Sequence, residues 1–176
     1  MRTLLMSAAF AAVLVACTPP AQRDAEAPAP DRPTVQACNS VAPNAARMVT
    51  VEEELAVAAA ASDLRGGRIN PGTYDLASAR RIGAASGWQG ARAVALEVSE
   101  AAAGAVTFNW SSVGAGGDAD TWTATFTDTP EAASLSYTCG RVGEVAADFN
   151  ASADALELRL PDGGSGRLAL TFQRRT

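Results

Sequence analysis

Apolar and polar side chains alternate with a period of two along most of this 176-residue chain from Gly72 onward. Val94, Leu96 and Val98, for example, are separated by Ala95 and Glu97. Such alternation is typical of β-strands that place one face on a core and the other in solvent. Eight segments follow it, at residues 74–76, 94–98, 106–110, 122–126, 135–137, 145–149, 156–160 and 168–172. The pattern predicts an all-β domain.

The connections between the predicted strands are short and rich in turn-forming residues. Residues 114–118 read GAGGD, and residues 161–164 read PDGG. Turns of this kind join adjacent antiparallel strands, and none of these connections is long enough for a parallel crossover. A meander of eight strands avoids free edges best by closing on itself. We therefore expect an eight-stranded antiparallel up-and-down barrel, with a two-sheet β-sandwich as the alternative.

The segment before these strands has a different composition. Residues 44–64 read NAARMVTVEEELAVAAAASDL, and alanine is the residue that most favours helices. Met48, Val51 and Leu55 recur at helical spacing, and three glutamates lie near the start of the run. The pattern predicts an N-terminal helix that ends at Gly66. The run VTVEEELAV is also compatible with a first strand, which stays open as the alternative.

The first residues combine a positive charge, Arg2, with a short apolar run over residues 4–16. This run has the length of a signal-peptide hydrophobic region and is too short to cross a bilayer. It ends in LVAC at residues 14–17, which resembles the lipobox of bacterial lipoproteins. The resemblance implies export, cleavage before Cys17 and lipidation of its thiol. An ordinary secretory signal peptide is the alternative.

In lipoproteins of this kind, an aspartate after the cysteine favours retention in the inner membrane, and this chain has Thr18 there. The resemblance therefore implies a lipoprotein of the bacterial outer membrane that faces the periplasm. Two or three acyl chains, such as palmitate, would anchor it. Residues 18–36 are rich in Pro, Ala and charge and predict a disordered tether. The chain then divides into a signal peptide (1–16), a lipidated cysteine with its tether (17–36) and a barrel domain (37–176).

Three cysteines are present in the sequence. Lipid on Cys17 would leave Cys38 and Cys139 in an oxidising compartment, where paired cysteines form disulfides. We therefore expect a Cys38–Cys139 disulfide, and two buried free thiols are the alternative.

Several residue types that carry catalysis are missing from the sequence. It has no His and no Lys, which removes the commonest general base, the nucleophilic triads, lysine Schiff bases and the P-loop lysine. The net charge is −5, or −6 once Arg2 is removed, and argues against binding to nucleic acid. Asp118 and Asp120 lack the further oxygen ligands that Ca²⁺ needs and are interpreted as a solvated turn. We expect no enzyme activity, no cofactor and no metal.

The stretch GGRINPGTYDL at residues 66–76 resembles the opening of a diffuse group of secreted bacterial lipoproteins. The likeness continues through Cys139-Gly140 and ends with the segment 156–174, LELRLPDGGSGRLALTFQR. The domain of these proteins is small, all-β and similar to lipocalins. The resemblance therefore implies a lipocalin-like (calycin) barrel with room for a ligand inside it.

A second resemblance is to small barrel lipoproteins that inhibit lysozyme. It rests on Tyr137-Thr138-Cys139 and on Ser165-Gly166. In that family the cysteine lies early in the domain and the Ser-Gly loop continues to a tyrosine. Here Cys139 lies late and Leu168 follows the loop, so this chain departs from the pattern.

Six aromatic side chains on the predicted inward faces are candidates for ligand contact. An eight-stranded barrel is just wide enough either to fill itself or to hold one small ligand, so a solid aromatic core is the alternative. Trp88, on a glycine-flanked loop, could gate the mouth, contact a partner or cap the open end. The six candidates are Tyr74, Phe108, Trp110, Trp122, Phe126 and Tyr137.

Three functions remain open. The favoured one is a non-catalytic binding module for a small apolar ligand or a protein partner, which predicts an internal cavity. The second is a structural or inhibitory envelope protein with a solid core, which predicts an exposed patch around Trp88. The third is a carboxylate-based hydrolase, which needs two acidic side chains facing each other in a cleft.

Overall fold

The structure is a computed structural model that describes residues 37–54, 64, 66–84, 87–163 and 165–176. The predicted signal peptide, Cys17 and tether lie outside the described residues. Apart from a short 3₁₀ helix (Ala102–Gly104), the elements found are all strands. They are β1 (Val49–Glu54), β2 (Gly72–Ile82), β3 (Ala91–Glu100), β4 (Val106–Gly114), β5 (Ala119–Asp128), β6 (Ala133–Cys139), β7 (Glu144–Ala151), β8 (Ala155–Pro161) and β9 (Arg167–Arg174).

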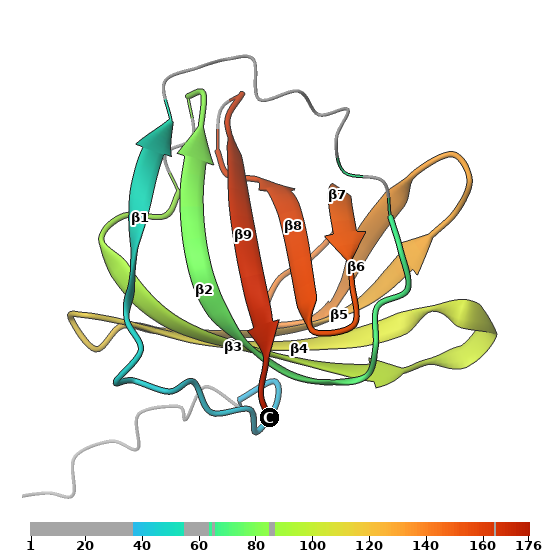
Figure 1. The fold of residues 1–176 in the computed structure, drawn as a ribbon, viewed down its shortest axis with the longest axis horizontal. Helices are drawn as coiled ribbons and strands as arrows, with labels where there is room; N and C mark the ends of the chain where they lie inside the picture. Colours follow the sequence, from blue (N-terminus) through green and yellow to red (C-terminus); the bar gives the residue numbers. More distant parts are fainter. Residues whose placement is uncertain (1–36, 55–63, 65, 85–86, 164) are drawn as a thin grey trace, which may run out of the picture. The chain divides into compact units, whose positions relative to one another are not determined.

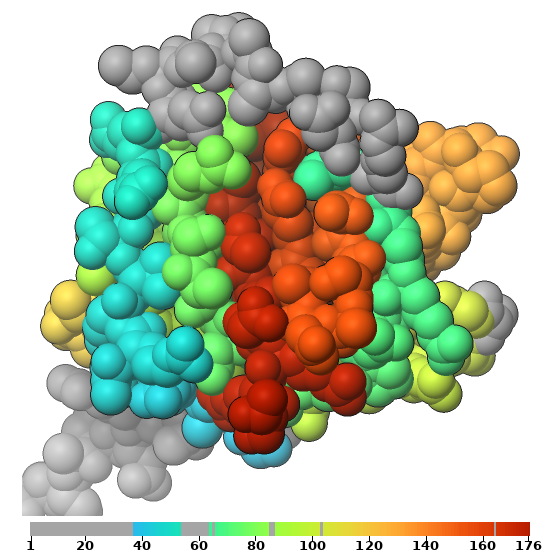
Figure 2. All heavy atoms as spheres, viewed as in Figure 1, coloured from blue at the N-terminus to red at the C-terminus, as the bar shows by residue number. Residues whose placement is uncertain are grey.

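The strands form one sheet that closes on itself (Figure 1). From β2 to β9, each strand pairs antiparallel with the next, and β9 pairs antiparallel with β2. The closing register runs from Tyr74 opposite Arg174 to Ile82 opposite Arg167. Figure 2 shows this closing region from outside, with β1, β2, β9 and β8 side by side. The described residues thus form the expected all-β meander rather than a two-sheet sandwich.

The expected number of eight strands and the expected helix are both wrong for residues 49–54. These residues form β1, which pairs parallel with β2 and antiparallel with β3. At this end of the sheet β2 and β3 separate, and β1 lies between them as a ninth strand. Val49 and Val51 pack against the core, so tertiary pairing outweighs the helix propensity of the segment. Residues 55–63, the rest of the expected helix, lie outside the described residues.

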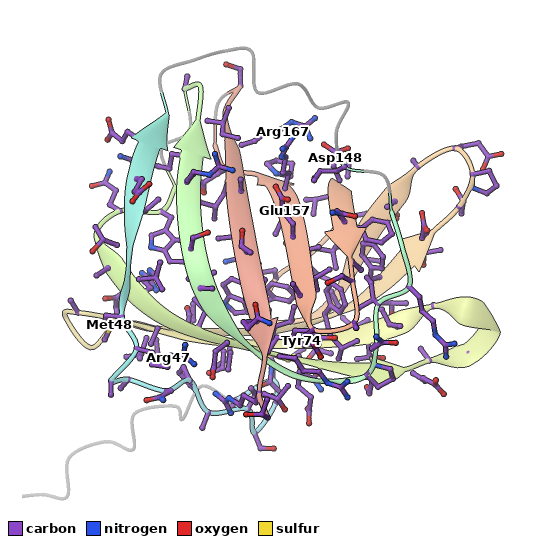
Figure 3. The ribbon with its side chains drawn as sticks, in the orientation of Figure 1. Arg47, Met48, Tyr74, Asp148, Glu157 and Arg167 are labelled. Carbon is purple, nitrogen blue, oxygen red and sulfur yellow. A yellow bond between two sulfur atoms is a disulfide. The ribbon has the colours of Figure 1, made fainter. Side chains whose placement is uncertain are left out.

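The inside of the closed sheet is filled through its middle by the predicted inward residues. Phe108 and Phe126 stack with ring centroids 5.1 Å apart, and Phe149 meets Phe126 edge-on at 5.0 Å. Figure 3 shows side chains filling the space between the strands, with Tyr74 labelled in its lower part. The largest fully buried side chains are Trp122, Tyr74, Phe108, Phe172, Leu76, Leu96, Leu135, Leu156, Leu158 and Leu170.

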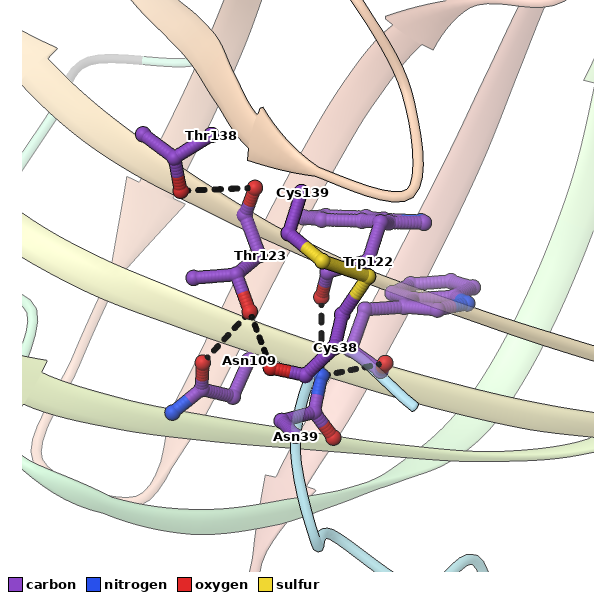
Figure 4. Close-up of a disulfide and its surroundings, with 8 residues drawn as sticks. Cys38, Asn39, Asn109, Trp122, Thr123, Thr138 and Cys139 are labelled. Atoms are coloured by element: carbon purple, nitrogen blue, oxygen red, sulfur yellow. Dashed lines mark hydrogen bonds between the residues drawn. A yellow bond between two sulfur atoms is a disulfide. The ribbon is translucent and has the colours of Figure 1, made fainter. Parts of the chain in front are cut away.

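The predicted disulfide joins Cys38 to Cys139 and fixes the segment before β1 to the end of β6 (Figure 4). Strict alternation would turn Cys139 inward together with Tyr137. A bulge between the pairs Thr123/Cys139 and Ala124/Tyr137 places Cys139 opposite Thr123 instead. The hydroxyl of Thr123 donates to the Cys38 carbonyl at 3.3 Å. The bulge therefore sets the cysteine on the face where the incoming chain can reach it.

Two polar contacts hold the ends of the described chain. The Asn39 amide donates to the carbonyls of Trp110 and Trp122, both at 3.0 Å (Figure 4). The Arg175 guanidinium forms hydrogen bonds of 2.6–3.0 Å to the buried carboxylate of Asp75. These hydrogen bonds raise the pKa of Arg175 above its usual value. The segments before β1 and after β9 are thus fixed to the outside of the sheet.

Candidate functional site

The closed sheet is hollow at both ends and filled between them. Strand β3 marks the two ends, because Arg92 at its start lines one cavity and Glu100 at its end lines another. The cavity beside Arg92 has a volume of about 460 Å³, and the one beside Glu100 about 340 Å³. Both volumes fall within the range of small-molecule sites, roughly 300–1,000 Å³.

All three tryptophans of the chain line the larger cavity, which we call the tryptophan cavity. It lies where the β2–β3, β6–β7 and β8–β9 connections meet the first residues of β3 and β5. Its apolar wall is made of Trp88, Trp110, Trp122, Tyr137, Leu160, Leu168 and Leu170.

The indole N–H groups of the three tryptophans beside this cavity are buried. Trp88, Trp110 and Trp122 are only 6%, 5% and 1% exposed. Each Nε1 is buried and has no hydrogen-bond partner among the described residues. Indole is a donor only, and a buried donor without an acceptor costs roughly 1–3 kcal/mol. Nearly all buried donors in proteins have a partner, so these three are unusual, although their Nε1 atoms are packed against protein and are not themselves exposed to the cavity.

Two arginines lie at the polar rim of the tryptophan cavity, and each is paired with a carboxylate. Arg92 pairs with Asp118, and Arg141 lies 2.6 Å from Asp120. The Arg141 guanidinium also lies over the Trp122 ring, 5.7 Å from its centroid. A cation above an aromatic face stabilises that ring from outside. Arg141 therefore covers part of the aromatic wall.

The β2–β3 connection is fixed across the mouth to the β8–β9 turn. Asp162 Oδ2 accepts a hydrogen bond from the Trp88 backbone N–H at 3.2 Å. The backbone N–H of Gly87 donates to the Asp162 carbonyl at 3.3 Å, and a Cβ at Gly87 would lie 2.1 Å from Asp162 Oδ1. The glycine thus permits the close approach that brings the Trp88 ring inward. Trp88 is buried, so its own side chain is not part of an exposed patch.

The smaller cavity has a more polar wall. Phe126 and Phe149 form its floor, and Arg68, Glu100 and Asp128 are among its lining side chains. No tryptophan is among its lining residues. We regard the tryptophan cavity as the candidate site.

The six aromatic residues predicted from the sequence do not all lie together. Trp110, Trp122 and Tyr137 line the tryptophan cavity, and Phe126 lines the smaller cavity. Tyr74 and Phe108 are 1% and 0% exposed, and they line neither cavity.

The polar wall of the site was missed, although the sequence carries a signal for it. Arg92, Ser112 and Asp120 occupy inward positions of β3, β4 and β5, each two residues beyond the last large apolar residue on that face. Ser112, for example, follows Trp110 on the same face and is 2% exposed. Extending the alternation past the apolar residues would have placed these side chains at one end of the sheet.

The acidic residues considered as a calcium site are engaged elsewhere, since Asp118 pairs with Arg92 and Asp120 with Arg141. No group of three or more possible metal-ligating side chains is found in the part of the chain that the structure describes. The same part contains no helix with the length and hydrophobicity needed to cross a bilayer.

Comparisons with known proteins assign the chain to no family. No protein-family model matches it, and no curated protein sequence does. Among solved structures, the chain is similar to a de novo designed fluorescence-activating β-barrel. The two share 12% sequence identity with a TM-score of 0.42, over 60% of this chain and 94% of the designed one.

Proposed function

We propose that this protein is a non-catalytic binding module whose barrel holds one small, largely apolar ligand in the tryptophan cavity. The observation that carries the proposal is a cavity of about 460 Å³ at one end of the closed sheet, with three tryptophans and Tyr137 in its wall. A solid core that acts only through its surface has no use for such a cavity. The absence of His and Lys from the sequence also favours binding over catalysis.

We also propose that lipid on Cys17 anchors the module to the outer membrane, facing the periplasm, because residues 1–18 fit a lipoprotein signal. Metabolic labelling with an alkyne palmitate tests this. The wild-type chain should incorporate label and separate with outer-membrane vesicles on a density gradient. The Cys17→Ala variant should not incorporate label. Equal labelling of both chains would contradict the anchor.

Native mass spectrometry of the full chain, purified in lipid nanodiscs, tests the binding module. We expect a stoichiometric small-molecule adduct that is lost on unfolding. Ser112→Phe should abolish the adduct, because its ring fills the tryptophan cavity. Ser136→Phe makes the same change at an exposed position of β6 and is the matched control. An adduct that survives Ser112→Phe would place the ligand elsewhere. No adduct on the wild-type chain would favour the structural or inhibitory envelope protein.

A further inference from the structure

The rim of the tryptophan cavity contains a place that already holds a cation, the guanidinium of Arg141. We infer that the ligand of this cavity is an organic cation with an apolar body, such as a quaternary ammonium compound, and that its cationic group displaces the Arg141 guanidinium. This inference rests on the proposed function and adds the chemistry of the ligand to it.

The guanidinium of Arg141 lies in a corner formed by two aromatic rings and a carboxylate. The rings of Trp122 and Tyr137 are nearly perpendicular, at 87°, with centroids 5.3 Å apart. The guanidinium carbon lies 5.7 Å from the Trp122 centroid and 5.8 Å from the Tyr137 centroid. Its Nη2 donates to Asp120 Oδ2 at 2.6 Å. Aromatic faces attract organic cations, and a carboxylate adds an opposite charge, so we call Asp120, Trp122 and Tyr137 the cation corner.

The cation corner is accessible from solvent and continuous with the tryptophan cavity. The side chains of Arg141 and Asp120 are 46% and 36% exposed, so the place of the guanidinium can be reached from outside. All three residues of the corner also line the cavity. A ligand with its cationic group in the corner can therefore place its apolar body against the tryptophans and leucines of the wall.

The position of Arg141 on a turn allows its side chain to leave the corner. Arg141 lies in the β6–β7 connection between Gly140 and Gly143, so it can swing outward without movement of a strand. An exposed ion pair and a cation–π contact each shift an equilibrium by about fivefold or less. A ligand makes the same contacts and also buries apolar surface, which the guanidinium does not. Such a ligand therefore competes effectively for the corner.

The charge that remains when Arg141 leaves also favours a cation. The other ionisable lining residues are Arg92, Asp120 and Asp162, and Arg92 is paired with Asp118. These four side chains carry one positive and three negative charges. The whole chain has a net charge of −5, so its field attracts cations rather than anions.

Phenyltrimethylammonium and tert-butylbenzene test the inference, because they share one shape and differ only in a charged nitrogen or a neutral carbon. Each is titrated by calorimetry into the full chain in lipid nanodiscs, with Ser112→Phe as the control for partition into lipid. Arg141→Gln empties the corner, so we expect it to raise the affinity for the cation about fivefold and to leave the affinity for tert-butylbenzene unchanged. Adding Asp120→Asn or Tyr137→Leu to Arg141→Gln should remove this gain.

Arg92→Gln is the matched control, because it removes the same charge from the same cavity but leaves Arg141 in the corner. We expect it to raise the affinity for the cation by about twofold or less, since Arg92 is paired with Asp118 outside the corner. An equal gain in Arg92→Gln and Arg141→Gln would assign the effect to net charge and overturn the inference.

Nuclear magnetic resonance locates the bound cation directly. The chain has two tyrosines, so ¹³C-tyrosine labelling gives two sets of ring resonances, and Tyr137→Leu assigns them. The N-methyl protons of bound phenyltrimethylammonium should show nuclear Overhauser effects to the Tyr137 ring, and these should be stronger in Arg141→Gln. A bound cation without these effects would lie outside the corner and would overturn the inference.

The outcomes separate this inference from the proposed function. If tert-butylbenzene binds and Arg141→Gln does not raise the affinity for the cation, the cationic ligand is overturned and the binding module stands. If neither probe binds above the Ser112→Phe control, the inference is overturned. The binding module is overturned with it only if native mass spectrometry of the wild-type chain also shows no adduct.

Discussion

Trp110 and Trp122 lie directly opposite each other in the β4–β5 pair, and their rings stack with centroids 5.1 Å apart and planes within 11°. Each of the two rings also contacts another aromatic ring edge-on. The ring centroids of Phe172 and Trp110 lie 5.9 Å apart, and those of Tyr137 and Trp122 lie 5.3 Å apart. The same two rings therefore complete the core and form the floor of the tryptophan cavity.

This stacking predicts that the two tryptophans stabilise the fold together. Trp122→Ala should lower the free energy of unfolding by about 3–5 kcal/mol, because the side chain is fully buried. In a double-mutant cycle of Trp110→Leu and Trp122→Leu, the coupling should be about 0.5–1.5 kcal/mol. Guanidinium unfolding followed by circular dichroism measures all four proteins. Strictly additive effects would show that the stacking contributes nothing beyond burial.

The Cys38–Cys139 disulfide joins residues 101 positions apart in the sequence, which predicts a large effect on stability. In the chain-entropy model, removing a bridge of this length costs about 4–5 kcal/mol. Replacing both cysteines with serine, or reducing the wild-type protein, should lower the unfolding free energy by a comparable amount. Thermal unfolding with and without reductant measures this. A midpoint that does not move on reduction would mean that the bridge does not constrain the unfolded chain.

Gly140 should tolerate substitution far less than Gly143, although both have positive φ angles, 77° and 93°. A Cβ at Gly140 would lie 2.2 Å from the Thr121 carbonyl and 3.0 Å from Cys38 Sγ, whereas nothing lies within 4 Å of one at Gly143. Gly143→Ala should cost about 1 kcal/mol from backbone strain alone. Gly140→Ala should cost clearly more and slow formation of the disulfide, which thiol titration during refolding would detect. Equal costs would argue against the close packing of this turn.

The buried hydroxyl of Tyr74 leads us to predict that the folded protein loses stability at alkaline pH. Burial raises the pKa of Tyr74 above its usual value, and its hydroxyl donates to the Asn70 carbonyl at 2.7 Å. The unfolded chain releases the Tyr74 hydroxyl proton at about pH 10, while the folded chain retains it at that pH. The stability that the protonated Tyr74 hydroxyl contributes is therefore complete below about pH 10 and is lost as the pH rises through the folded-state pKa.

Tyr74→Phe removes this titration and one hydrogen bond. We expect it to cost about 1 kcal/mol at pH 7 and to flatten the fall in stability above about pH 10. Urea unfolding at a series of pH values, with Tyr137→Phe as the companion variant, measures both effects. An unchanged alkaline slope in Tyr74→Phe would assign the loss of stability to other groups.

The period-two alternation predicted where strands β2 to β9 lie, because each strand buries one face and exposes the other. For β1 the sequence predicted a helix, with a strand only as the alternative, because alanine-rich segments favour helices locally and only the gap between β2 and β3 selects a strand. The bulge before Cys139 was also missed. Its position depends on pairing with β5, which no local pattern records.

The site was only partly predictable for a related reason. Trp110, Trp122 and Tyr137 were chosen because they point inward, but inward positions at the middle and at the end of a strand look alike in sequence. Phe108 thus became core, while Trp110, two residues further on, reached a cavity. The shape of each end of the sheet depends on the loops, including the β2–β3 connection, where the Trp88 backbone N–H donates to Asp162.

The pairing of β9 with β2 affects when the sheet can close during synthesis. β9 is the last strand in sequence, and it completes both the β8–β9 hairpin and the closure with β2. Until residues 167–174 have emerged from the ribosome or a translocation channel, two strand edges remain unpaired and open to other chains. Closure of the sheet therefore comes late, because it waits for the strand that follows all the other described strands.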